Sequence, residues 1–165
     1  MASTVFPAPS AASKTMFRTT LTSGTSYTVP AGVTYLNVTL VGAGGGAGND
    51  SAGRGSNPGL GGQIVSSTLS TSGGASISYS IGAGGAAAAL GATSSGSNGG
   101  NTTFTGATTA TGGFGGNYYQ GGTAPAAEPA QVAGINAGNG GIGGVTTYTQ
   151  GGAGGNGYII VEYWV

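Results

Sequence analysis

Apolar and polar residues alternate along short stretches near the two ends of the chain. Within residues 35–41, Leu36, Val38 and Leu40 fall on one face of an extended segment, and residues 75–81 repeat the pattern. A period of two is typical of a half-buried β-strand. The same alternation, or a run of threonine and aromatic residues between turn signals, predicts further strands at residues 16–22, 26–29, 63–69, 102–105 and 145–149.

The last stretch, residues 158–165, is apolar on both faces, which predicts a strand in the centre of a sheet. Ser23-Gly24 is a turn signal between the first two predicted strands and predicts that they form a hairpin. Residues 42–60 show no alternation and are predicted to be a loop, and no stretch of the sequence predicts a helix. The predicted fold is therefore all-β: a small antiparallel β-sandwich built from the two ends of the chain, with long loops.

Between the predicted strands, glycine recurs with a period of three. Residues 112–116, 140–144 and 151–157 consist of Gly-Gly-x triplets, and Gly42, Gly45 and Gly48 keep the same spacing. This period fits a left-handed threefold helix of the polyproline II type, which has no internal hydrogen bonds and must pair its backbone sideways. We therefore expect polyglycine II-like segments packed beside the sandwich, with a flexible linker as the alternative. The triplets are too interrupted, and the six prolines too few, for collagen.

Composition taken by itself favours disorder. Glycine (39) and proline (6) account for 45 of the 165 residues, and Leu, Ile, Val and Phe together for only 27. Disordered chains, however, combine high net charge with few aromatic residues, whereas this chain has a formal net charge of zero and eight tyrosines. Because the apolar residues also gather into strand-like runs, we expect an ordered protein.

The few charged residues exclude several classes of function. Three cations cannot neutralise the phosphates of a nucleic acid, and without histidine or cysteine there is no zinc site of the usual ligands and no Ser-His or Cys-His nucleophile. The three acids, Asp50, Glu128 and Glu162, are scattered, whereas a glycosidase needs two positioned carboxylates. We predict no catalytic, cofactor-binding or metal-binding residue, and therefore a protein that is not an enzyme. No run of apolar residues is long enough to span a membrane, so we expect no membrane insertion.

Five motifs follow one another in residues 16–165. They are Gly24-Thr25-Ser26-Tyr27-Thr28-Val29-Pro30-Ala31-Gly32, Leu40-Val41-Gly42-Ala43-Gly44-Gly45-Gly46, Ile81-Gly82-Ala83-Gly84-Gly85, Gly100-Asn101-Thr102-Thr103-Phe104 and the C-terminal Gly157-Tyr158-Ile159-Ile160-Val161-Glu162-Tyr163-Trp164. In this order the motifs resemble the glycine-rich domain of bacteriophage tail fibres and related virion proteins. By analogy, the chain is similar to phage tail-tip adhesins in which polyglycine II helices stack and loops contact the host receptor. The resemblance implies a protein on the surface of a phage virion.

Two groups of residues are candidates for contacts. Aromatic rings and amides stand side by side in a glycine-rich frame, a combination suited to a sugar or a flat protein surface; the alternative is that these tyrosines merely cover the glycine layer. These candidate host or ligand contacts are Asn117, Tyr118, Tyr119, Gln120, Tyr148 and Gln150. Residues 1–15 are predicted to be an extended arm, either a loose terminus or an anchor to the virion through Val5, Phe6, Pro7 and Pro9.

The expected function is that of a non-enzymatic structural protein of a phage virion, a tail-fibre or tail-tip module that contacts the host cell surface. The alternative is a capsid decoration or head-fibre protein attached to the phage head through the N-terminal arm. A regular ice-binding protein is a third possibility, but Thr108-Thr109 and Thr146-Thr147 are too few for its threonine arrays. The expected partners are other virion proteins, further copies of the chain in a homo-oligomer, with a trimer as the guess, and a host surface glycan or outer-membrane protein.

Overall fold

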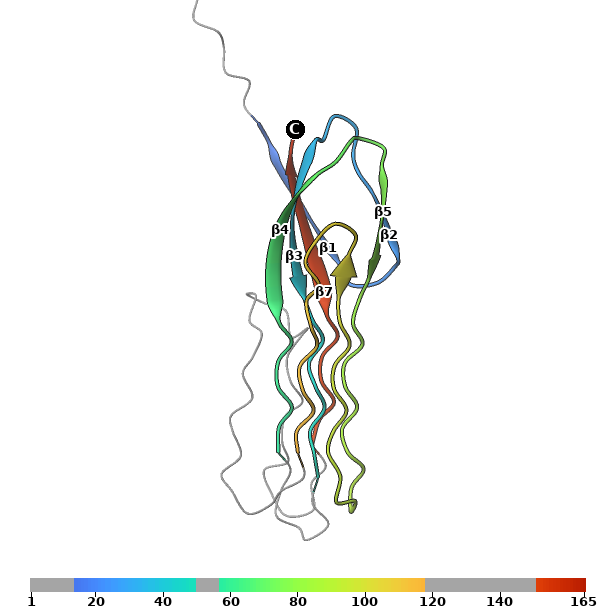
Figure 1. Cartoon of the computed structure of the whole chain (residues 1–165), viewed down its shortest axis with the longest axis vertical. Coiled ribbons are helices and arrows are strands. Elements are labelled where there is room, and N and C mark those ends of the chain that lie inside the picture. The colour runs from blue at the N-terminus through green and yellow to red at the C-terminus, as the bar shows by residue number, and fades with distance from the viewer. Residues whose placement is uncertain (1–13, 50–56, 118–150) are drawn as a thin grey trace, which may run out of the picture.

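The computed structural model describes residues 14–49, 57–117 and 151–165. These residues form two antiparallel sheets and no helix, so none of them lies in a helix that could cross a membrane (Figure 1). The four-stranded sheet has the order β1-β7-β3-β4, and the three-stranded sheet has the order β2-β5-β6. The strands are β1 (Met16–Leu21), β2 (Ser26–Thr28), β3 (Tyr35–Val41), β4 (Ile64–Ser70), β5 (Ser76–Ser80), β6 (Thr103–Phe104) and β7 (Tyr158–Trp164).

The structure confirms the all-β prediction and seven of the predicted strands, and it places β7 between β1 and β3, in the interior of its sheet, as expected. The strand predicted at residues 145–149 lies outside the described residues. The predicted hairpin is wrong, because β1 pairs with β7 and β2 pairs with β5. The turn at Gly24, with a φ of 96°, carries the chain from one sheet to the other. β1 pairs with β7 over six residues. One of these pairs is Phe17 with Tyr163, whose rings stack with their centroids 5.4 Å apart.

The hydrophobic core fills the space between the two sheets. Successive residues of a strand point to opposite faces, so every second residue of β3 and β7 points inward. The buried members of the core are Val29, Val33, Leu36, Val38, Leu40, Tyr79, Phe104, Ala110, Ile159 and Val161. Burying each of the larger side chains stabilises the fold by about 1.5–3 kcal/mol relative to exposure, before the entropy of ordering the chain is counted.

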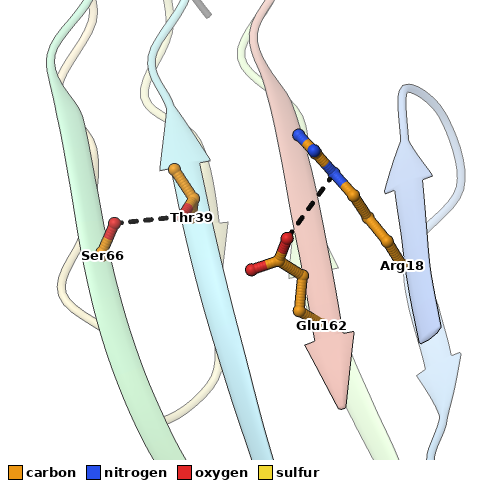
Figure 2. A network of polar contacts seen from close by, with 4 residues as sticks. All are labelled: Arg18, Thr39, Ser66 and Glu162. Atoms are coloured by element: carbon orange, nitrogen blue, oxygen red, sulfur yellow. Dashed lines mark hydrogen bonds and ion pairs between the residues drawn. The ribbon is translucent and has the colours of Figure 1, made fainter. Parts of the chain in front are cut away.

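Hydroxyl and charged side chains occupy the opposite face of the four-stranded sheet. Figure 2 shows two of its lateral contacts: Thr39 and Ser66 share a hydrogen bond of 3.0 Å, and Arg18 Nε lies 3.7 Å from Glu162 Oε1. β3 alternates inward apolar with outward polar residues, as a strand with one solvated face does, whereas β7 also places the buried Ile160 on the outer face.

The glycine-rich segments continue directly from the strands and form a bundle below the sheets (Figure 1). The prediction that these segments lie beside the sandwich is wrong, because they extend it at one end. Residues 42–49 follow β3 and occupy the centre of the bundle, where all of them are buried. The loop predicted over 42–60 is therefore wrong for residues 42–49, which are ordered by backbone hydrogen bonds.

Those hydrogen bonds have a period of three. The N–H groups of Gly42, Gly45 and Gly48 donate to segment 57–63, those of Ala43, Gly46 and Asn49 donate to segment 94–101, and those of Gly44 and Ala47 donate to segment 151–157. Two further segments, 82–88 and 110–117, donate to carbonyl groups of the central one. A threefold helix turns each successive N–H by a third of a circle, which explains why three neighbours are served in rotation.

Glycine makes this packing possible, because a side chain would collide with the neighbouring backbone. A Cβ placed on Gly99 would overlap the carbonyl oxygen of Ala43, and one on Gly46 would overlap the carbonyl oxygen of Ala86. The threefold spacing of glycine in the sequence is thus the spacing of the positions that face another segment.

Candidate functional site

A groove runs along the outside of the bundle, in the half that lies away from the sheets. It follows segment 110–117, which is hydrogen-bonded to segment 57–63 on one side and to segment 94–101 on the other. Its volume is about 430 Å³, and its lining residues are Asn57, Pro58, Leu60, Ser95, Gly96, Asn98, Phe114, Gly115, Gly116 and Asn117. A volume of this size lies within the range of small-molecule sites, roughly 300–1,000 Å³.

Phe114 is the large aromatic side chain of the groove, and 68% of its surface is exposed. Its backbone is fixed, because its carbonyl oxygen accepts the N–H of Leu60 at 2.8 Å. The glycines on either side face neighbouring segments, since a Cβ on Gly113 would overlap the Leu60 carbonyl and one on Gly115 the Gly96 carbonyl. Each turn of the threefold helix has three residues, and the two glycines beside Phe114 already face neighbouring segments. The Phe114 side chain therefore points outward, into solvent.

Asparagine side chains complete the backbone pairing of this outer segment. Asn98 Oδ1 accepts the N–H of Gly115 at 2.8 Å, and Asn101 Oδ1 accepts the N–H of Gly112 at 3.0 Å. Asn98 and Asn101 are three residues apart, and so are Gly112 and Gly115. The amides therefore repeat with the period of the threefold helix and accept hydrogen bonds from N–H groups that face outward. The bond to Gly115 holds the Asn98 amide beside the groove and leaves its NH2 group as a hydrogen-bond donor.

The groove differs from the sheet half of the molecule in its electrostatics. Of the described residues that line the groove, none has an ionisable side chain. The ion pair of Arg18 with Glu162 lies on the four-stranded sheet, and no group of three or more metal-ligating acid, histidine or cysteine side chains occurs in the described residues. The groove can therefore offer hydrogen bonds and an aromatic surface, but the described lining offers no acid–base group.

The residues predicted as contacts are only partly placed by the structure. Asn117 lines the groove, and its role as a contact residue stays a prediction. The remaining five, Tyr118, Tyr119, Gln120, Tyr148 and Gln150, lie outside the described residues, as do the predicted anchor residues Val5, Phe6, Pro7 and Pro9. Sequence reasoning missed Phe114 and Asn98. The available signal was an aromatic residue at the third position of a Gly-Gly-x triplet, the position that must face outward.

A second surface lies at the opposite end, where the described ends of the chain, Lys14 and Val165, are neighbours. Thr15 and Val165 exchange two backbone hydrogen bonds there, of 2.9 and 3.1 Å. Large apolar side chains are exposed around them, namely Met16, Phe17, Tyr35, Trp164 and Val165, which we call the aromatic end. Several exposed large apolar side chains at one end of a fold are typical of a site of protein interaction.

Residues 19–134, more than half of the chain, match the family described as a glycine-rich domain. The chain therefore belongs to this glycine-rich domain family. None of the curated proteins matches the chain.

Proposed function

We propose that this chain is a non-enzymatic structural protein on the surface of a bacteriophage virion, and that it presents its glycine-rich bundle to the host cell. The observation that carries the proposal is the separation of two exposed surfaces. The groove around Phe114 lies in the bundle half, and the aromatic end lies at the far end of the sheets.

The bundle is suited to hold a binding surface at a distance. Every residue from Gly42 to Asn49 donates its N–H to a neighbouring segment, so the central segment cannot bend without breaking several hydrogen bonds at once. A ligand that binds such a preorganised surface does not have to order it first.

The aromatic end suits attachment to another virion protein. Tyr35 is 60% exposed and Trp164 is 42% exposed, and together with Lys14 and Thr34 they line a shallow pocket of about 360 Å³. Aromatic residues are enriched in the buried centres of protein interfaces, where they contribute most of the binding energy. Anchoring at this end leaves the bundle projecting outward.

The test is carried out on purified particles of the phage that encodes this chain. Quantitative mass spectrometry should find the chain in the particles, at a few copies or at multiples of three or six per virion, as a tail component requires. Hundreds of copies per particle would assign it to the capsid instead, and its absence from particles would overturn the proposal. Virions that carry Phe114→Ala should incorporate the chain normally and adsorb to host cells more slowly than the parent.

A further inference from the structure

We propose that the groove around Phe114 binds a neutral saccharide. The inference rests on the proposed function, because it names the kind of host-surface ligand that the bundle would contact. It is argued from four properties of the described groove: an exposed ring, fixed amides, a floor of glycine and a lining without charge.

The exposed ring supplies an apolar platform. Phe114 has 68% of its surface in solvent, and its ring points away from the segments that its backbone holds together. The face of an aromatic ring carries partial negative charge. The C–H face of a sugar ring is apolar and carries partial positive charge, so it can lie flat on the Phe114 ring.

Amides supply the polar contacts around the ring. Asn57, Asn98 and Asn117 line the groove, and Ser95 adds a hydroxyl group. A carboxamide both donates and accepts hydrogen bonds, as each sugar hydroxyl does, so the two kinds of group can pair in either direction. The orientation of the Asn98 amide is already set by its 2.8 Å bond to the Gly115 N–H.

The floor of the groove is backbone. Gly96, Gly115 and Gly116 line it and carry no side chain. The Cβ positions of these glycines face neighbouring segments, so what they present to the groove is main chain, which a flat ligand can approach between Leu60 and Asn98. Phe114 in the groove wall is 68% exposed, so the groove is open to solvent, and its volume of about 430 Å³ suits a short stretch of a chain of sugars.

The lack of charge selects among ligands. An anionic ligand such as a phosphate or an acidic sugar is normally met by arginine, lysine or a helix N-terminus. None of the described lining residues is a cation, and the described cations Lys14 and Arg18 lie in the sheet half. A neutral ligand loses no charge solvation when it enters such a groove.

The experiment measures binding by isothermal titration calorimetry on the full chain. The probes are linear hexasaccharides of glucose, mannose, galactose and N-acetylglucosamine, with a hexamer of galacturonic acid as the anionic comparison. We expect at least one neutral probe to bind with a Kd below ~1 mM, a weak affinity suited to many copies acting together. Phe114→Ala should weaken that binding by at least about tenfold, because an aromatic contact and its buried area are lost.

Two further variants separate recognition from folding. Asn98→Asp keeps the oxygen that accepts the Gly115 N–H and removes the NH2 donor, so it should weaken saccharide binding while the thermal midpoint stays unchanged. Tyr35→Ala removes a ring that is similarly exposed, 60%, but lies at the aromatic end, and it should leave saccharide binding unchanged. Binding of the galacturonic acid probe alone, binding insensitive to Phe114→Ala, or no binding to any probe would overturn the proposal.

A cell-binding assay distinguishes failure of this inference from failure of the proposed function. The labelled chain is added to host cells treated with periodate, which cleaves the vicinal diols of sugars, or with a protease. Loss of binding after periodate supports a saccharide. Loss after protease alone means that the host partner is a protein: the saccharide inference then fails while the proposed function stands. A chain that binds neither treated nor untreated cells counts against both.

Discussion

Along strand β3 of the sheet half burial alternates, whereas along the central segment of the bundle half, residues 42–49, it is continuous. In β3, Leu36, Val38 and Leu40 are buried and the residues between them are partly exposed. Only a few residues later, the whole of segment 42–49 is buried without interruption. A strand has two neighbours and one covered face, but the central segment of the bundle is surrounded on all its described sides by other segments.

The two halves consequently fill their interiors with different material. Apolar side chains fill the space between the sheets, and their burial and close packing stabilise the fold. In the bundle, the interior is backbone, and each N–H of the central segment needs a carbonyl within reach. The same chain therefore has one region where a smaller residue is harmful and another where a larger residue is harmful.

The largest effect should come from shrinking a side chain in the sheet core. Leu40 is completely buried, and Leu40→Ala should lower the free energy of unfolding by about 2–5 kcal/mol, the usual cost of lost burial plus a cavity. Ala47→Gly is the matched change in the bundle, at an equally buried position, and should cost only about 1 kcal/mol. Urea unfolding measures both. An Ala47→Gly loss as large as that of Leu40→Ala would mean that side chains, not backbone, determine the packing of the bundle.

The second effect comes from enlarging a residue in the bundle. Gly99→Ala places a Cβ against the Ala43 carbonyl and should destabilise the protein by about 1–3 kcal/mol, as overpacking does. Its neighbour Gly100 is the control, because a Cβ there would meet nothing closer than the Ala83 nitrogen at 3.0 Å. Gly100→Ala should change stability by less than about 1 kcal/mol, since the reduced freedom of the unfolded chain offsets the closer contact. Equal losses at both positions would contradict the close-approach explanation of the glycine period.

The sequence predicts the strands of the sheet half and, from the glycine period, the faces along which the bundle packs, because periods of two and three are properties of neighbouring residues. The exception is the loop predicted over 42–60, where the absence of a period of two does not mean disorder. The sequence does not predict partners. The Ser23-Gly24 signal is the same whether the turn joins two paired strands or carries the chain from one sheet to the other. Only the pairing of β1 with β7, at the other end of the chain, shows that the turn crosses between the sheets. Likewise, the period of three in residues 42–48 indicates the type of helix but not the three segments that receive its N–H groups.

The candidate site shows the same limit. The sequence singles out Asn117 because an amide beside tyrosines is a recognisable local combination, and the residue lies in the groove. Asn98 and Leu60 reach the groove from segments that are far from Asn117 in the sequence, and no local pattern connects them. They are brought together by the hydrogen bonds of segment 110–117 to both of its neighbours.

The third effect contrasts two buried tyrosines. The Tyr79 hydroxyl donates a 2.7 Å hydrogen bond to the Ser23 carbonyl, whereas the fully buried Tyr158 hydroxyl has no partner among the described residues. Tyr79→Phe should therefore destabilise the protein by about 1 kcal/mol, and Tyr158→Phe should be neutral or stabilising by up to about 1 kcal/mol. Thermal unfolding of the two variants is the measurement. If Tyr158→Phe costs as much as Tyr79→Phe, the Tyr158 hydroxyl is satisfied by a bound water or by a residue outside the described part of the chain.

The fourth prediction concerns the pH dependence of stability. Burial raises the pKa of Tyr158, with an opposing contribution from Arg18, and burial together with nearby Tyr163 raises the pKa of Tyr27. The unfolded chain then loses these protons at a lower pH than the folded one, so the free energy of unfolding falls as pH rises above about 10. Because the chain has no histidine, the thermal midpoint should stay nearly constant between about pH 6 and 9. In the Tyr158→Phe variant the free energy of unfolding should fall less steeply above about pH 10. An unchanged fall in that variant would contradict a raised pKa of Tyr158 as its cause.

The smallest effect should come from the charged pair on the outer face of the four-stranded sheet (Figure 2). Arg18 Nε and Glu162 Oε1 are 3.7 Å apart, with side chains 51% and 30% exposed, so water and salt screen their attraction. A double-mutant cycle with Arg18→Met and Glu162→Gln should give a coupling energy of no more than about 0.5 kcal/mol. Thr39 and Ser66 join the neighbouring strands of the same face without any charge, at 3.0 Å, so the face does not depend on the ion pair for its lateral contacts. A coupling energy above about 1.5 kcal/mol would show instead that this pair fixes the register of β1 on β7, and the sheet half would then depend on charge as well as on side-chain volume.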